Sequence, residues 1–341
     1  MRYYLLVGTI AALAAAWSGG WIYIADQMRA EIQRLAKQKT QGQELTYRDM
    51  EITGFPFRVQ VNMSKPRIVV RGGPLPFSWE TDQIKAVGHS WQPRHILFDL
   101  TGQHQLAVNV GRQWRKLILQ NGAAMASVET AADGKLEQLS LNINKPWLRY
   151  RGVSVLRGAR LQFHARPAPG QSNGMDLALR ADALEVIEGA LPAGLISMPR
   201  TARLVDLQAT ATGLPEGAFT AGQLGRWRDD GGTLEITAFR AQWGDMEIYV
   251  TGSLALDNEM RPIGALTARI KGHDELLDML VVGGMMKKNA AAAARAVLGL
   301  LAAAGGGVLS VPVRLQDGQL FLGPAPVARL GPLLQNNAER D

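Results

Sequence analysis

The spacing of apolar residues divides the chain into three parts. From Tyr3 to Ile24 the residues are uncharged and mostly apolar, and from Asp26 to Lys39 apolar residues recur at helical spacing. Beyond Lys39 apolar and polar residues begin to alternate, which is typical of half-buried strands. A helical period returns after His273. The pattern therefore predicts an N-terminal helix, a long β-rich region and a late helical segment.

The uncharged run is long enough to cross a membrane. As a helix it would extend roughly 33 Å, and the hydrocarbon core of a bilayer is about 30 Å thick. The competing hypothesis is a cleaved signal peptide, because A-x-A patterns end at Ala14 and Ala16. The apolar run continues to Ile24, so we favour an uncleaved anchor. We expect a transmembrane anchor over residues 1–24 and a helical stalk over residues 25–40.

The charges that flank this run suggest its orientation. Arg2 and the amino terminus precede it, and the cytoplasmic flanks of membrane spans are enriched in positive charge. Arg29 and Arg34 follow on the other side and weaken this bias. We expect a single-pass protein of a bacterial inner membrane, with its C-terminal domain in the periplasm.

The β-rich region covers residues 41–272. Alternation is clearest over residues 55–63, and Gly and Pro punctuate similar short runs further along. No long helical pattern separates these runs, which argues against a parallel sheet. We predict a fold that is mainly β with α, built on a large curved antiparallel β-sheet. The further predicted strands are residues 96–100, 106–110, 139–143, 153–156, 177–179, 204–211, 234–239, 247–255 and 265–270.

Two segments of this region resemble each other. Residues 64–72 (SKPRIVVRG) and residues 144–152 (NKPWLRYRG) share Lys, Pro, Arg and Gly at matching positions. Two related β modules, near residues 50–130 and 135–272, would explain the match. Chance similarity over so short a stretch is the alternative.

The last segment, residues 273–341, is predicted to contain helices, a hairpin and an irregular tail. Asp274 and Glu275 suit the first turn of a helix, and the Ala-rich residues 285–304 predict a second helix that packs on the sheet. Asp317-Gly318 is a strong turn signal and predicts a closing hairpin. From Pro324 onward we expect irregular structure. A short helix is also expected at residues 219–228.

Residue types that carry chemistry are scarce or poorly spaced. The chain has no cysteine, and its five histidines lack the spacing of a zinc site. Residues 88–92 (GHSWQ) match a nucleophile elbow except at the last position. Adjacent carboxylates such as Asp229 and Asp230 resemble turn residues more than a hydrolytic pair. We therefore expect no enzymatic activity, no cofactor and no bound metal.

Composition adds one further exclusion. The chain is 47% hydrophobic and 20% charged, which is ordinary for a globular protein, and its net charge is +7. The basic residues are dispersed and form no aromatic-basic motif, so we expect no nucleic-acid partner.

One block near the start of the β-rich region is distinctive: Gly54-Phe55-Pro56-Phe57-Arg58. It resembles the signature of domain of unknown function 2125, an uncharacterised and largely alphaproteobacterial family. Residues 252–264 resemble a later block of that family, as do residues 311–318 after the Ala-rich helix. The resemblance implies no established activity and no catalytic residues.

The block has two interpretations. In the structural one, which we favour, Phe55 and Phe57 fill the core and Pro56 marks the edge or start of a strand. In the other, the block contacts a partner. The layout as a whole also resembles, more distantly, AsmA-type envelope proteins, which are associated with lipid movement or outer-membrane assembly. Such an analogy of architecture does not by itself establish function.

A functional expectation follows from the predicted sheet. A curved sheet with one apolar face either packs against helices or holds acyl chains, and any part that the late helices leave uncovered would favour lipid. We expect a non-enzymatic, membrane-anchored periplasmic protein that binds or shields lipid in cell-envelope biogenesis or maintenance. The alternative is a protein-interaction scaffold that docks an envelope protein, and a cryptic hydrolase ranks third.

Overall fold

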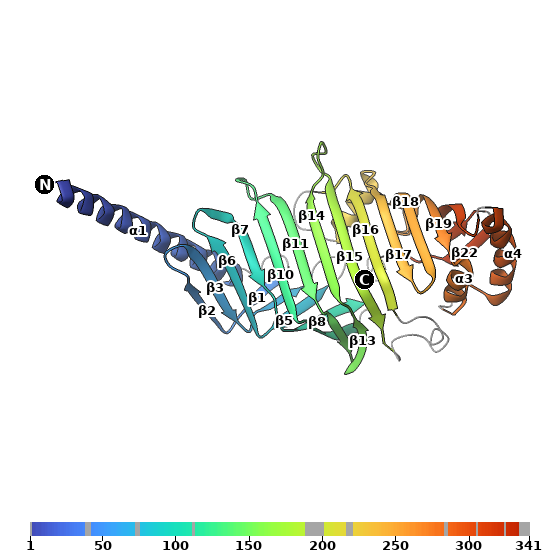
Figure 1. Cartoon of the computed structure of the whole chain (residues 1–341), viewed down its shortest axis with the longest axis horizontal. Coiled ribbons are helices and arrows are strands. Elements are labelled where there is room, and N and C mark those ends of the chain that lie inside the picture. Colours follow the sequence, from blue (N-terminus) through green and yellow to red (C-terminus); the bar gives the residue numbers. More distant parts are fainter. Residues whose placement is uncertain are drawn as a thin grey trace, which may run out of the picture.

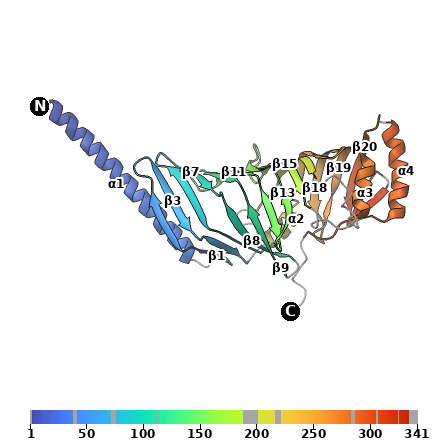
Figure 2. The ribbon, with the colours of Figure 1, turned by 60° about the horizontal axis from the view of Figure 1, so that its bottom comes forward.

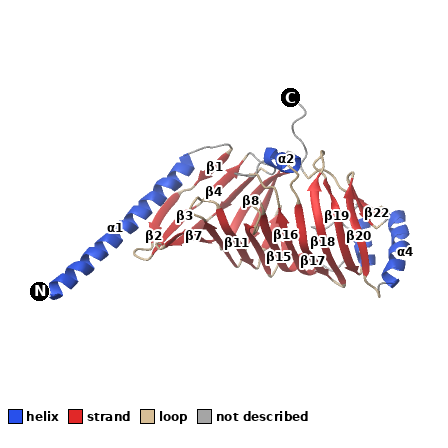
Figure 3. Ribbon diagram, turned by 90° about the horizontal axis from the view of Figure 1, so that it is seen from above, coloured by secondary structure: helices blue, strands red, loops and turns tan. Residues whose placement is uncertain are grey.

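The fold is one large antiparallel sheet with helices at both ends and the short helix α2 (Ala221–Asp229) beside its middle (Figure 3). In the part of the chain that the structure describes, all 22 strands belong to a single sheet, every strand pairing is antiparallel, and there are four helices. The prediction of a mainly β fold with a large antiparallel sheet is confirmed. The computed structural model describes residues 2–37, 42–71, 76–110, 113–187, 201–215, 221–282, 286–304, 306–323 and 325–333.

The predicted strands and helices fall on observed elements. The helices are α1 (Arg2–Lys37), α2 (Ala221–Asp229), α3 (His273–Val282) and α4 (Lys288–Ala304). The first strands are β1 (Gln43–Thr46), β2 (Asp49–Thr53), β3 (Arg58–Ser64), β4 (Arg67–Val70), β5 (Phe77–Thr81), β6 (Gln83–His89), β7 (Gln92–Asp99), β8 (Gln103–Val110), β9 (Gln113–Gln120), β10 (Ala123–Thr130) and β11 (Leu136–Asn144). The remaining strands are β12 (Trp147–Tyr150), β13 (Val153–Arg157), β14 (Arg160–Pro167), β15 (Met175–Val186), β16 (Thr201–Ala211), β17 (Leu234–Trp243), β18 (Met246–Leu256), β19 (Pro262–Lys271), β20 (Leu309–Gln316), β21 (Gln319–Leu322) and β22 (Ala325–Arg329).

The sheet divides into two arms that meet at β15. The main arm contains β2, β3, β6, β7, β10, β11 and β14, and it continues from β15 through β22. The side arm contains β1, β4, β5, β8, β9, β12 and β13, and it joins β15 near Val186. The two arms lie at an angle to each other (Figure 3).

The bend lies where the chain leaves a strand of the main arm and enters a strand of the side arm. Between β3 and β4, Lys65 has a φ of 49°, and between β11 and β12, Lys145 has a φ of 51°. Lys65 donates a backbone hydrogen bond to Asp82 and also pairs with its carboxylate, which lowers the pKa of that carboxyl. Both lysines precede a buried proline and then a short strand of the side arm. The two similar segments therefore have the same local structure, within one continuous sheet.

Helices occupy both ends of this elongated molecule. α1 contacts β1 and β3 at one end, whereas α3 and α4 pack against the last strands at the other (Figures 1 and 2). At the second end Leu277 of α3, Leu298 of α4 and Leu309 of β20 are fully buried in one hydrophobic cluster. The late helices thus pack on the sheet as the sequence predicts.

Two sequence predictions are wrong. Phe55 and Phe57 are 54% and 64% exposed and do not fill the core, because β3 begins at Arg58, after both of them. The tail after Pro324 is not wholly irregular, since β22 pairs with β21. Proline is tolerated in β22 because this strand pairs on one side only, and Pro326 needs no N–H on the other.

Candidate functional site

One face of the main arm is apolar from β2 to β20. The residues of a central row, which we call the apolar row, lie directly opposite one another on neighbouring strands, so their side chains share one face. The row contains no polar residue. Its members are Ile52, Val61, Ala86, Phe98, Ala126, Leu141, Phe163, Leu179, Leu207, Phe239, Val250, Ala268 and Val311.

Rows on either side of the apolar row extend this face. Residues two positions apart in a strand point the same way, so partners at that offset belong to the same surface. One flanking row runs through Val128, Leu139, Ala165, Leu177 and Ala209. The other runs through Ala124, Ile143, Leu161, Ala181, Val205, Ala241, Ile248, Ile270 and Leu309.

The opposite face of the same strands is polar. Arg180 forms ion pairs with Asp182 at 3.0 Å and with Asp206 at 3.7 Å. An antiparallel sheet with one solvated face normally buries the other. The polar row that contains these residues is Asn142, Gln162, Arg180, Asp206, Arg240, Tyr249, Arg269 and Ser310.

Helices cover the apolar face at its C-terminal end and leave its middle open. Leu277 and Leu298 pack in one cluster with Ala268 and Val311, which are 2% and 3% exposed. For the described helices, the main contacts with the sheet lie on β1, β3, β18, β20 and β22. In the strands between, the large side chains of the apolar row, such as Phe163, are only half-buried.

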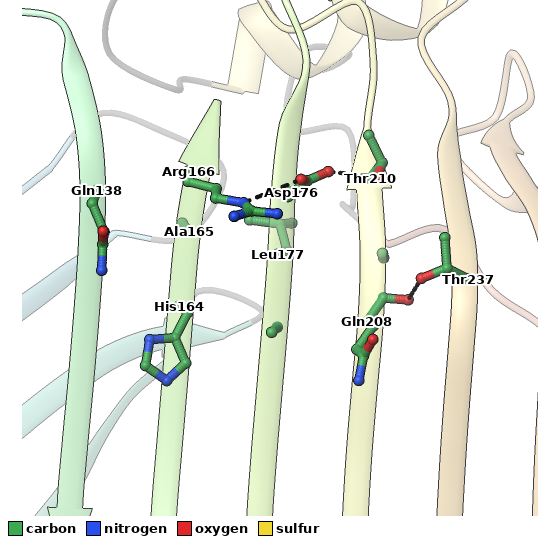
Figure 4. Close-up of a pocket in the computed structure, with 11 residues that line it drawn as sticks. Gln138, His164, Ala165, Arg166, Asp176, Leu177, Gln208, Thr210 and Thr237 are labelled. Atoms are coloured by element: carbon green, nitrogen blue, oxygen red, sulfur yellow. Dashed lines mark hydrogen bonds and ion pairs between the residues drawn. The ribbon is translucent and has the colours of Figure 1, made fainter. Parts of the chain in front are cut away.

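One pocket lies over the polar face and shows no catalytic arrangement. It is a shallow depression of about 500 Å³ over β11 and β14 to β17 (Figure 4). Asp176 pairs with the Arg166 guanidinium at 3.3 Å and accepts a hydrogen bond from the Thr210 hydroxyl at 2.8 Å, so its carboxylate is already occupied. His164 is exposed and lies 2.9 Å from the Ser140 hydroxyl. Among the described residues no group of three or more acidic or histidine side chains could hold a metal ion.

The predicted motif lies at the N-terminal end of the main arm. Gly54, Phe55, Pro56 and Phe57 form the turn between β2 and β3, and Arg58 begins β3. The motif therefore lies at the end of the sheet that α1 contacts, away from the open middle of the apolar face (Figure 1).

Two tryptophans of α1 hold this turn. The Trp17 indole donates a hydrogen bond to the Pro56 carbonyl at 2.9 Å, and the Trp21 indole donates to the Arg58 carbonyl at 2.8 Å. The Trp21 ring also meets the Phe55 ring edge-to-face at 5.5 Å. Sequence reasoning missed this contact, although the spacing of four residues between the tryptophans places both on one helix face.

The first residue of the motif must be glycine. Gly54 has a φ of 102°, and a Cβ there would lie 2.7 Å from both Cγ and the carbonyl oxygen of Arg58. The Arg58 amide in turn donates to the Gly54 carbonyl at 3.1 Å and closes the turn. The turn thus presents its carbonyl oxygens to the α1 tryptophans.

A comparison with protein-family profiles identifies the family of the chain. The profile of a family described as an uncharacterized protein conserved in bacteria (DUF2125) matches residues 21–331. The chain belongs to the DUF2125 family. The match covers the motif, the whole sheet and α3 and α4, so all the features described above except the first part of α1 lie within the DUF2125 region. No curated protein and no solved structure matches the chain.

In this DUF2125 protein, none of the helices, as far as the structure describes them, is long and apolar enough to cross a bilayer.

Proposed function

We propose that this DUF2125 protein binds or shields lipid acyl chains on the apolar face of its main arm, in cell-envelope biogenesis or maintenance. The observation that carries the proposal is the apolar row, whose large side chains stay half-buried between β7 and β17. Contiguous apolar surface left open in a folded protein marks an interaction site. An acyl chain is a fitting occupant because it offers apolar contact and needs no hydrogen bonds.

The dimensions of the face support this occupant. Neighbouring strands lie about 4.8 Å apart, so the row from β7 to β17 extends for about 29 Å. One leaflet of a bilayer is about 15 Å thick in its hydrocarbon part, so the face can hold at least one acyl chain across the strands. Each methylene removed from water contributes about 0.8 kcal/mol, and ten such groups would contribute about 8 kcal/mol before the costs of binding.

The proposal includes an anchor in the inner membrane. It is supported by the uncharged run from Tyr3 to Ile24, which lies wholly within α1, the helix whose N-terminal part projects beyond the end of the sheet (Figure 1). The side chains of Ile10, Leu13 and Ile22 are more than half exposed, which is costly for an isolated helix in water. The C-terminal domain would then lie in the periplasm.

Mass spectrometry of co-purified lipid tests the binding proposal. The full chain would be purified from bacterial membranes into a mild detergent and ionised intact, beside an unrelated single-span protein prepared in parallel. We expect a stoichiometric phospholipid or glycolipid that survives conditions that strip lipid from the control. Removal of all lipid under the same conditions would contradict the proposal and favour the scaffold, for which cross-linking would then seek a protein partner.

A further inference from the structure

Three large aromatic side chains are exposed at the end of the main arm that contacts α1. Phe55 is 54% exposed, Phe57 64% and Trp91 58%. Single exposed apolar residues are common on proteins, but several large aromatic residues in adjoining turns form a surface that water solvates poorly. We call these three residues the aromatic tip.

The two turns that carry the aromatic tip are joined. The Ser90 amide of the β6–β7 turn donates to the Phe57 carbonyl at 3.3 Å, and Arg58 lies opposite His89 in the β3–β6 register. The His89 ring stacks on the Trp91 ring at 4.8 Å. The aromatic tip is therefore one surface, held by backbone contacts.

Contacts with α1 also fix the position of the aromatic tip along the axis of that helix. Trp17 and Trp21 donate to the carbonyls of Pro56 and Arg58, and one turn later Ala25 is only 5% exposed. One side of the helix thus contacts the domain at the level of the tip, and the helix extends beyond the tip towards its N-terminus (Figure 1).

Helix length then places the tip relative to a bilayer. From Tyr3 to Trp17 the helix rises only about 21 Å, which is less than a hydrocarbon core of about 30 Å. The uncharged run must therefore continue through Trp17 and Trp21 to Ile24 to cross the membrane. Any β turn that is docked on Trp17 and Trp21 must then lie in the same membrane layer.

The chemistry of the tip fits this layer. Tryptophan prefers the boundary between headgroups and acyl chains, and phenylalanine side chains insert just below it. Arg58, which follows Phe57, and Arg94, three residues after Trp91, are exposed and can pair with lipid phosphates.

We propose that the aromatic tip inserts into the outer leaflet beside α1, as a second contact between the domain and the bilayer. This inference rests on the membrane anchor of the proposed function. The contact would fix the main arm relative to the membrane, with the N-terminal end of its apolar face next to the lipid.

Single-cysteine labelling tests the inference directly, because the native chain has no cysteine. Phe57→Cys in the full chain would carry an environment-sensitive fluorophore in vesicles of phosphatidylethanolamine and phosphatidylglycerol. Leu13→Cys reports on the anchor, and Val153→Cys, which is 52% exposed on the side arm, is the control in water. We expect blue-shifted emission and quenching by spin-labelled lipid at positions 13 and 57, with neither at position 153.

The possible outcomes separate the two proposals. Quenching at position 13 but not at position 57 would overturn the insertion of the tip and leave the anchor intact. Absence of quenching at both positions would overturn the anchor and, with it, the inference. Equal quenching at positions 57 and 153 would also overturn it, because the label would then be following non-specific contact with the vesicles.

Discussion

The apolar face of the main arm meets two different environments along its length. At β19 and β20 the apolar row consists of Ala268 and Val311, which α3 and α4 bury almost completely. At β14 and β17 the same row consists of Phe163 and Phe239, which stay half-buried. Small residues let a helix approach the sheet closely, whereas large ones without a helix leave a thick apolar surface. The covered end is therefore a core, and the middle is an apolar surface on which none of the described helices packs.

The largest expected effect is on stability at the covered end. Leu298→Ala should cost about 2–5 kcal/mol in free energy of unfolding, because the side chain is fully buried in α4. Leu207→Ala, in the open middle, removes the same atoms from a half-buried position and should cost much less. Urea unfolding of both variants in detergent measures the difference. Equal losses would show that the middle is also a packed core.

The next prediction compares lipid retention after a charge is added to the apolar face and to the polar face of the main arm. Phe163→Arg places a charge on the apolar face and should reduce lipid co-purification tenfold or more, the equivalent of about 1.4 kcal/mol. Gln162→Arg is the matched control, since it adds the same charge to the polar face one residue away. Intact-mass spectrometry of both variants gives the lipid-bound fraction. A similar reduction in both would show that charge, and not the apolar face, determines lipid retention.

An effect on stability that is smaller than the one at the covered end is expected at the N-terminal end, where α1 is held by a turn and not by a broad core. Gly54→Ala should cost about 1–3 kcal/mol, because the new Cβ would clash with Arg58 at a positive φ. Gly134→Ala also has a positive φ but meets no atom within 4 Å, so it isolates the clash from the backbone strain. Hydrogen exchange of the β2–β3 turn should rise in the first variant only. Equal exchange in the two variants would contradict the assigned role of Gly54.

The smallest effect is a pH dependence in the β18–β19 turn, beside the covered end. Burial raises the pKa of Asp257, but hydrogen bonds from the amides of Arg261 and Glu259 and from the Arg261 guanidinium outweigh it and hold the pKa below its usual range. A lowered pKa in the folded state means that this stability is present above the ordinary pKa of the carboxyl and is lost as the pH falls through the lowered one. Asp257→Asn should flatten the fall in urea midpoint between pH 5 and about pH 2. An unchanged pH profile would exclude this contribution.

The sequence predicted the elements better than their arrangement. Alternation identified most strands because one face of each is apolar. Val59 and Val61 are only 2% and 4% exposed, as that pattern requires. The hairpin at Asp317-Gly318 and the helix that begins at His273 are confirmed. These signals are local, so residues close in sequence carry them.

The candidate sites depend on contacts between distant residues, which local patterns do not report. Phe55 and Phe57 continue the alternation of β3 but lie outside it, and the partner of their turn is a helix 39 residues earlier. The bend at Lys65 depends on a positive φ that lysine rarely adopts. The apolar row becomes visible only when the register aligns the strands across the whole arm.

Photo-cross-linking with a lipid that carries a diazirine in its acyl chain tests the central claim most directly. The full chain in bacterial membranes would be irradiated, digested and sequenced by mass spectrometry. We predict adducts on the half-buried residues of the apolar row, such as Phe163, Leu179 and Leu207, and none on their polar-face neighbours Gln162, Arg180 and Asp206. Adducts confined to α1, with the apolar row unlabelled, would contradict the assignment of the main arm as a lipid-binding surface.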